Sequence, residues 1–203
     1  MDLLRPPEPS RYDINFRLFR TPIRVPPGFW LVQLAIAVAI AIRGDLLSSG
    51  LWVPAAFVSI LIHEFGHIAA GRRFGAPGEI VLTFFGGLAV GSSNLFARWR
   101  RILVYLAGPL AQFSFAVLLF VGLEIYDESL TLHELNYPSR GQQLLEETWV
   151  ILMAMNTFWP ALNLLIPIEP LDGGQIIREW ADWRVGRNNP APWEQDPDWW
   201  KRR

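Results

Sequence analysis

Four apolar segments dominate this chain of 203 residues and restrict what it can fold into. They run over residues 29–42, 51–70, 102–123 and 148–168. A helix needs roughly 20 apolar residues to cross a bilayer, so the last three segments have the length of a span and the first is short. In lipid, every backbone polar group must be bonded within the protein, which favours helices. The sequence therefore predicts an all-α membrane bundle of four transmembrane helices.

Basic residues lie almost entirely on one side of this predicted bundle. If all four segments cross, residues 1–28, residues 71–101 and the C-terminal tail share a side and hold 16 of the 18 lysines and arginines. Only Arg43 and Arg140 fall on the other side. Cytoplasmic loops carry an excess of Lys and Arg, so both termini are predicted to be cytoplasmic. The same alternation supports the short first segment as a true span.

Composition excludes several classes of function. The 18 basic and 19 acidic residues nearly cancel, so the charge gives no reason to expect nucleic-acid binding. The absence of cysteine excludes disulfides, thiolate metal sites and a cysteine nucleophile. Residues 1–28 are polar and rich in Arg and Pro, so we expect no cleavable signal peptide. The four apolar segments predict a multi-pass membrane protein. Because the chain is compact, a prokaryotic cytoplasmic membrane is the predicted location.

Two stretches outside these segments are predicted to form β-structure. Residues 12–18 alternate apolar and polar side chains, and residues 23–25 are predicted to return as the second strand of a hairpin. Residues 79–90 are too few to span as a helix, and Gly86 and Gly87 would weaken one, so a re-entrant hairpin or strand pair fits better. The two hairpins give the predicted bundle a small membrane-associated β-sheet.

The chain divides into three predicted regions. Residues 1–28 form a cytoplasmic arm with the first hairpin, and residues 29–174 form the membrane-embedded core. Residues 175–203 form a tail with five tryptophans, a residue type enriched at membrane interfaces. This tail is predicted to begin as an interfacial helix around residues 175–185 and to continue as a Pro-rich strip on the membrane. A partner-binding tail is the alternative.

Two of the three histidines lie four residues apart inside the second apolar segment. Residues at this spacing share one helix face, so His63 and His67 can bind one metal ion while Glu64 reaches a water beside it. Chance matches to so short a pattern are common in soluble proteins. At membrane depth, however, an ionisable residue costs roughly 2.5–3.5 kcal/mol, so three together require a function. The motif therefore predicts a zinc site with Glu64 as its catalytic base.

A catalytic zinc site usually has three protein ligands, so the two histidines need a third partner. His133, the remaining histidine, falls in the loop predicted on the side away from the arginines. A carboxylate near the cytoplasmic end of another span is therefore expected. Asp172 follows the fourth segment and satisfies this condition, with Glu169 as a rival and Glu79 as a weaker one. An ordinary Asp-Gly turn at a helix end is the alternative interpretation.

These motifs resemble those of the site-2 protease family of intramembrane zinc metalloproteases. His63-Glu64-Phe65-Gly66-His67 is similar to the family's first motif. Pro170-Leu171-Asp172-Gly173-Gly174 is similar to its second, in which the aspartate is the third zinc ligand. Ala107-Gly108-Pro109-Leu110 and Phe85-Gly86-Gly87 resemble its small-residue helix motif and its Gly-rich membrane hairpin. The resemblance covers about residues 12–178 and implies one zinc ion per chain.

The resemblance also implies a reaction. Zinc bound by His63, His67 and Asp172 would act with Glu64 as general base to cleave transmembrane segments of single-span membrane proteins near the cytoplasmic face, as in regulated intramembrane proteolysis. The hairpin at residues 79–90 would hold the substrate as an added strand. Its glycines, Gly86 and Gly87, would permit close backbone approach.

The sequence departs from the family pattern at one position. The family usually has an asparagine eight residues before the zinc aspartate, where it helps to position the substrate. Here that position is Leu164, and Asn163 is nine residues back. Asn163 is therefore the candidate for this role, and Asn156 is a weaker one.

Three other classes of protein remain as alternatives. The first is a non-proteolytic zinc-binding membrane protein of the same fold, acting in binding or assembly. The second is another class of membrane metallopeptidase with the same first motif, and the third is a structural bundle with heme or metal between its helices. The presence of Glu64 argues against the first and third, because neither requires a general base.

Overall fold

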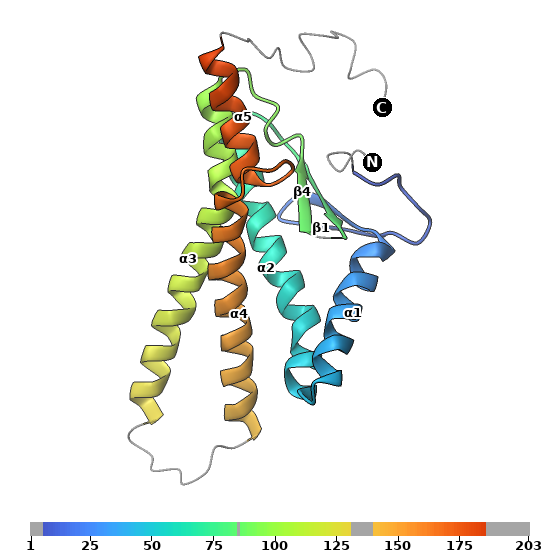
Figure 1. Ribbon diagram of the computed structural model, residues 1–203, viewed down its shortest axis with the longest axis vertical. Coiled ribbons are helices and arrows are strands. Elements are labelled where there is room, and N and C mark those ends of the chain that lie inside the picture. Colours follow the sequence, from blue (N-terminus) through green and yellow to red (C-terminus); the bar gives the residue numbers. More distant parts are fainter. Residues whose placement is uncertain (1–5, 85, 131–139, 186–203) are drawn as a thin grey trace.

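The structure, a computed structural model, describes residues 6–84, 86–130 and 140–185. This described part of the chain contains, in order, β1, β2, α1, α2, β3, β4, α3, α4 and α5. Figure 1 shows a bundle of long helices with a small sheet beside the upper part of α2. His133 and the predicted Pro-rich strip of the tail lie outside the described residues.

Three helices are long and apolar enough to cross a membrane: α2 (Leu46–Arg73), α3 (Arg98–Leu130) and α4 (Arg140–Leu165). The first apolar segment forms a shorter helix, α1 (Pro27–Ile42), of 16 residues. The helix does not extend further upstream, because Val25 belongs to a strand and pairs with Ile14. At 1.5 Å per residue, α1 is about 24 Å long.

The four strands form a single sheet in the order β1-β2-β3-β4. The strands β1 (Ile14–Leu18) and β2 (Thr21–Val25) pair antiparallel, as do β3 (Glu79–Thr83) and β4 (Gly86–Val90). A parallel pairing of β2 with β3 joins the two hairpins, with Ile23 opposite Ile80. The predicted N-terminal arm and the Gly-rich stretch therefore belong to one sheet, in which β4 is an edge strand.

The buried face of this sheet packs on α1 and α2. Alternate residues of β2 point into the core, as expected for a strand with one buried face. The core cluster consists of Ile23, Val25, Phe29, Ile60, Leu61, Ile68, Ile80 and Leu82. Because this cluster fixes the sheet to the middle of α2, strand β4 lies over the part of α2 that carries the His-Glu motif (Figure 1).

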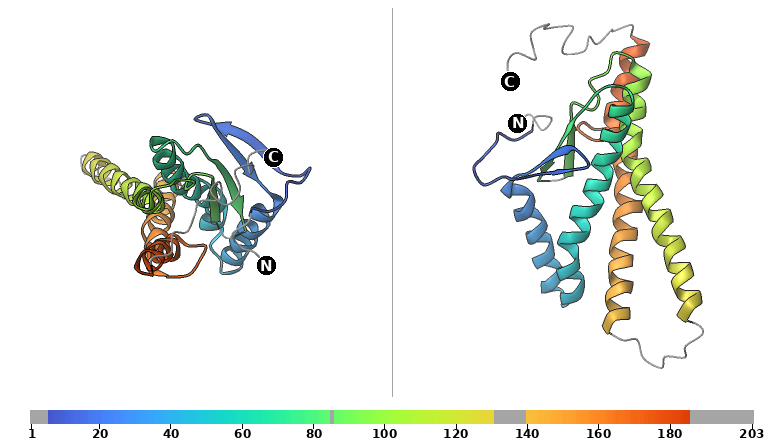
Figure 2. Two further views of the ribbon diagram at one scale, coloured as in Figure 1. Left: turned by 90° about the horizontal axis from the view of Figure 1, so that it is seen from above. Right: turned by 180° about the vertical axis from the view of Figure 1, so that it is seen from behind.

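Helix α5 (Asp172–Arg184) follows α4 after a non-helical connection at residues 166–171 and packs on α3 and α4. Its position as a helix agrees with the prediction for residues 175–185. Seen from above, α1 and the sheet lie on one side of α2, and α3, α4 and α5 lie on the other (Figure 2). Helix α2 is therefore the central element, and its polar residues can meet partners from both sides.

Glycines bring α2 and α3 to backbone distance. A Cβ atom at Gly66 would overlap the carbonyl oxygen of Ala107 on α3. A Cβ atom at Gly108 would overlap the imidazole of His67 on α2. The small-residue motif of the third apolar segment therefore lies directly against the histidines.

Candidate metal centre

Two hydrogen bonds from α3 orient the histidines of α2. The Nδ1 atom of His67 lies 2.7 Å from the carbonyl oxygen of Val104, which can only accept, so this Nδ1 carries the proton. The Nδ1 atom of His63 lies 2.8 Å from Oε1 of Gln112. The Gln112 amide nitrogen donates to the carbonyl oxygen of Ser59 at 3.3 Å, which fixes the orientation of the amide. In the neutral form, both histidines therefore present the lone pair of Nε2.

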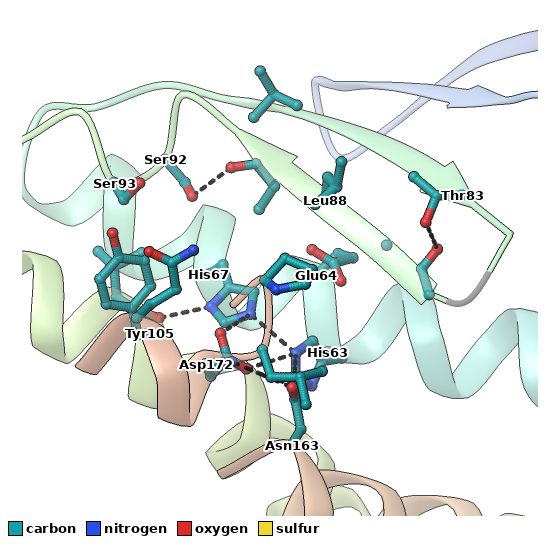
Figure 3. Close-up of a pocket in the computed structure, with 18 of the residues that line it drawn as sticks. His63, Glu64, His67, Thr83, Leu88, Ser92, Ser93, Tyr105, Asn163 and Asp172 are labelled. Carbon is teal, nitrogen blue, oxygen red and sulfur yellow. Dashed lines mark hydrogen bonds and ion pairs between the residues drawn. The ribbon is translucent and has the colours of Figure 1, made fainter. Parts of the chain in front are cut away.

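Three acceptor atoms meet at one point in the protein interior (Figure 3). The two Nε2 atoms of His63 and His67 are 3.0 Å apart. The Asp172 carboxylate places Oδ2 at 3.1 Å from His63 Nε2 and Oδ1 at 3.4 Å from His67 Nε2. All three residues are buried. Since neutral imidazoles turn their Nε2 lone pairs toward one another and toward the carboxylate here, the group fits a cation, and two imidazoles with one carboxylate suit zinc.

Asp172 is held in place by Asn163. The aspartate begins α5, and Asn163 lies in the last turn of α4. The amide nitrogen of Asn163 donates to Asp172 Oδ2 at 2.7 Å and is 3.2 Å from His63 Nε2. The backbone of Leu164 instead faces Gly173, where a Cβ atom would overlap the Leu164 carbonyl. Asn163, rather than a residue at position 164, therefore reaches the candidate site.

Glu64 lies between the histidines and strand β4, and only 3% of its surface is exposed. A Cβ atom at Gly87 would overlap the Glu64 carboxylate, so only glycine permits this approach of β4. A Cβ atom at Gly86 would meet nothing within 4 Å. The Oε2 atom of Glu64 is buried and has no hydrogen-bond partner among the described residues. One carboxylate oxygen is thus left available beside the metal-binding group (Figure 3).

These residues line a cavity of about 530 Å³. Strand β4 forms one wall, and the start of α5 with the end of α4 forms another (Figure 3). Apolar side chains in the lining include Ile60, Leu88 and Trp159, whereas Ser92, Ser93, Tyr105 and Gln175 contribute polar groups. The cavity therefore combines apolar and polar lining beside the metal-binding group.

The rival ligands lie elsewhere. Glu169 pairs with Arg178 at 3.0 Å, and Glu79 is exposed at the start of β3. Neither joins the only group of potential metal ligands found among the described residues, which contains His63, His67 and Asp172. Asn156 is buried two turns before Asn163 and donates to the Ser59 hydroxyl at 2.9 Å. It therefore belongs to the packing between α2 and α4.

Sequence reasoning missed the groups on α3 that orient the histidines. Gln112 is fully buried in the third apolar segment, and its polar side chain there was the available signal. The Val104 carbonyl leaves no signal in the sequence, because every residue has one. Both groups supply the hydrogen bonds that histidine ligands of metals generally make through their second ring nitrogen.

Comparisons with known proteins agree with this geometry. A zinc metalloprotease from Methanocaldococcus jannaschii is 26% identical over 164 residues, which cover 80% of this chain and 43% of the relative. A Synechocystis protein assigned by name to the zinc metalloproteases is 29% identical over 182 residues, covering 84% and 44%. The site-2 protease from M. jannaschii superposes with a TM-score of 0.58 at 24% identity, covering 85% of this chain and 73% of that structure. The comparisons support the resemblance of this chain to the site-2 protease family.

No family model matches the chain. The chain spans less than half the length of the two curated relatives, so the site-2 protease resemblance concerns the shared part only. The prediction of a mostly helical membrane protein with a small sheet is confirmed. The buried His-His-Asp group and the names of the relatives together support zinc as the metal.

Proposed function

We propose that the chain is an intramembrane zinc metalloendopeptidase that cleaves transmembrane segments of single-span membrane proteins near the cytoplasmic face. The observation that carries the proposal is the meeting of three potential ligand atoms, from His63, His67 and Asp172, beside the Glu64 carboxylate in a cavity of about 530 Å³. One zinc ion per chain, when bound by these donors, supplies the Lewis acid that activates water for attack on a carbonyl.

Glu64 is the proposed general base and acid. Its Oε2 atom has no other partner among the described residues, so it can accept the proton of the attacking water. The same carboxyl group then delivers that proton to the leaving amine. Asn163, which holds the Asp172 carboxylate, is the proposed substrate-positioning residue, because its amide also lines the cavity.

Strand β4 is the proposed template for the substrate. A helical substrate hides its carbonyl groups in hydrogen bonds, so the segment to be cleaved must be extended. Edge strands bind extended peptides by adding them to the sheet, and β4 is an edge strand of the described sheet. Gly87 has no side chain between β4 and Glu64, so the added peptide would lie beside the catalytic groups.

The proposed setting is the cytoplasmic membrane of a prokaryote, with both termini cytoplasmic. Helix α1 is about 24 Å long, short of the roughly 30 Å hydrocarbon core. The sheet continues from the N-terminal end of α1, so α1 and the sheet together would cover the full depth as a fourth crossing (Figure 1). The Arg-rich residues 1–28 and 71–101 then lie on the same side, as the positive-inside rule expects. Regulated release of a membrane-anchored protein is the proposed role.

The test is Glu64→Gln in protein reconstituted into liposomes with a single-span substrate. The variant should keep its zinc but lose at least about a hundredfold in cleavage rate, the range typical for a general base. Glu147→Gln is the matched control, because Glu147 lies in the first turns of α4 and accepts a hydrogen bond from Ser48. Cleavage by Glu64→Gln at the wild-type rate would contradict the proposal, and zinc binding without any cleavage by wild type would favour the non-proteolytic alternative.

A further inference from the structure

A buried ion pair joins α5 to α3 two turns away from the metal centre. The Arg101 guanidinium donates from Nε and Nη2 to the two carboxylate oxygens of Glu179, each at 2.7 Å. Glu179 is 3% exposed. The remaining nitrogen, Nη1, donates to the carbonyl oxygens of Leu95 at 2.7 Å and Phe96 at 3.1 Å. The guanidinium plane is therefore fixed by both helices and by the segment that leads out of β4.

The spacing along the two helices places this pair in register with the metal centre. Glu179 is seven residues after Asp172 on α5, and Gly108 is seven residues after Arg101 on α3. Seven residues make nearly two turns, about 10.5 Å, and return to almost the same helix face. The two helices run in opposite directions, as the colours in Figure 1 show. The Arg101–Glu179 contact therefore forms one layer, and Gly108, the histidines and Asp172 form the next.

Helix α3 thus contacts one metal ligand, His67, directly and is connected to another, Asp172, through α5. Its Val104 carbonyl orients His67, and Val104 lies one turn after Arg101 on the same face. Asp172, by contrast, is hydrogen-bonded to Asn163 of α4 and reaches the centre on α5. The connection before it, residues 166–171, is not helical, so α5 does not continue the axis of α4. The Glu179 carboxylate, which also lies 3.5 Å from Arg98 Nε, is thus a charged contact that ties α5 to α3 beyond the metal centre.

We infer that Arg101 and Glu179 form a positioning clamp, which sets the Asp172 carboxylate against His63 and His67 and so controls metal affinity without touching the metal. Buried ion pairs are poor sources of stability, because desolvation offsets their attraction. A two-pronged Arg–carboxylate contact does, however, fix geometry more tightly than a single hydrogen bond. The inference rests on the proposed metal site, but not on proteolysis.

The experiment measures the dissociation constant of zinc for the full chain in nanodiscs, by competition with a chelator. Glu179→Gln and Arg101→Lys keep a polar contact but lose the paired charges or the planar fork. Each should weaken zinc binding about 10–100-fold, the usual cost of losing a group that orients a ligand. The matched control is Asp13→Asn, which removes one charge of the half-buried Arg24–Asp13 pair beside the sheet (3.0 Å) and should leave zinc binding unchanged.

A double-mutant cycle separates positioning from general destabilisation. If the clamp acts through Asp172, Glu179→Gln should cause no further loss of zinc affinity in an Asp172→Ala background. With cobalt as the probe, the visible spectrum of Glu179→Gln should shift toward that of Asp172→Ala, since this spectrum reports the donor set. The exchanged pair, Arg101→Glu with Glu179→Arg, should recover part of the lost affinity.

Wild-type zinc affinity in both Glu179→Gln and Arg101→Lys would overturn the clamp, as would a loss that adds fully to that of Asp172→Ala. If one variant does not fold, the other still gives the comparison. Equal zinc affinity of wild type and Asp172→Ala would instead show that the proposed ligand set is wrong, and the clamp would fall with it. If the wild-type protein binds zinc normally but cleaves no single-span substrate, that result would count against the proposed function and not against the clamp.

Discussion

Asn163 and Asp172 form a reciprocal hydrogen-bonded pair across the junction of α4 and α5. The Asn163 amide nitrogen donates to Asp172 Oδ2 at 2.7 Å, and the Asp172 backbone N–H donates to Asn163 Oδ1 at 3.3 Å. One carboxylate oxygen is thereby held, while the other lies 3.4 Å from His67 Nε2. The pair fixes both the rotation of the carboxylate and the start of α5.

Loss of the Asn163 amide should therefore weaken the metal centre. We expect Asn163→Ala to raise the dissociation constant of zinc about tenfold or more, because Asp172 would no longer be oriented. A chelator titration measures this change. The paired exchange Asn163→Leu with Leu164→Asn, which moves the amide to the usual family position, should not restore binding, since one helical residue is a rotation of 100°. Restored binding would contradict the placement of Asn163.

Gln112 should set the ring orientation and tautomer of His63. Gln112→Met keeps a similar volume but removes the acceptor of the His63 Nδ1 proton, leaving a buried donor that costs about 1–3 kcal/mol. We expect zinc affinity to fall about 10–100-fold, as for other groups that orient a metal ligand. The matched control is Gln33→Met on α1, where a buried Gln accepts from Trp52 at 3.0 Å. It should lower thermal stability but leave zinc affinity unchanged, and equal losses in both variants would count against the role of Gln112.

Local spacing in the sequence was sufficient to predict the parts of the site that lie on single elements. His63, Glu64 and His67 share one helix, so their relation follows from helical geometry. The two hairpins also followed from alternation and glycine content. The prediction of Asp172 as the third ligand also depended on the side of the membrane at which each segment was predicted to end. The structure brings Asp172 to the histidines, as predicted.

The remaining features depend on contacts between elements that are distant along the chain. The parallel pairing of Ile23 with Ile80 joins strands separated by two helices, and no local pattern encodes it. Gln112 meets His63 across 49 residues. Helical geometry could not predict the relative position of Asn163 and Asp172, which are nine residues apart. The two residues lie on different helices, because α4 ends at Leu165 and α5 begins at Asp172.

Gly108 should be indispensable for metal binding. A Cβ atom there would overlap His67 Nε2 and lie 2.9 Å from His63 Nε2, so Gly108→Ala must displace the atoms that would hold zinc. Zinc affinity should fall at least about tenfold, with an overpacking cost of about 1–3 kcal/mol. Gly122→Ala on the same helix is the control, since a Cβ atom there would meet nothing within 4 Å. It should bind zinc normally and be slightly more stable, because alanine favours helix.

The two glycines of β4 should respond differently to the same substitution. At Gly87 an added Cβ atom would overlap the Glu64 carboxylate, whereas at Gly86 it would meet nothing within 4 Å. Gly87→Ala should therefore displace Glu64 and reduce cleavage of a single-span substrate about a hundredfold, the order of a lost general base. Its zinc affinity should remain near that of wild type, because the three atoms nearest to the added Cβ all belong to Glu64, which is not a proposed ligand. Gly86→Ala should lose far less activity. Equal losses of cleavage activity in the two variants would indicate that the glycines are needed for the conformation of strand β4 rather than for the position of Glu64.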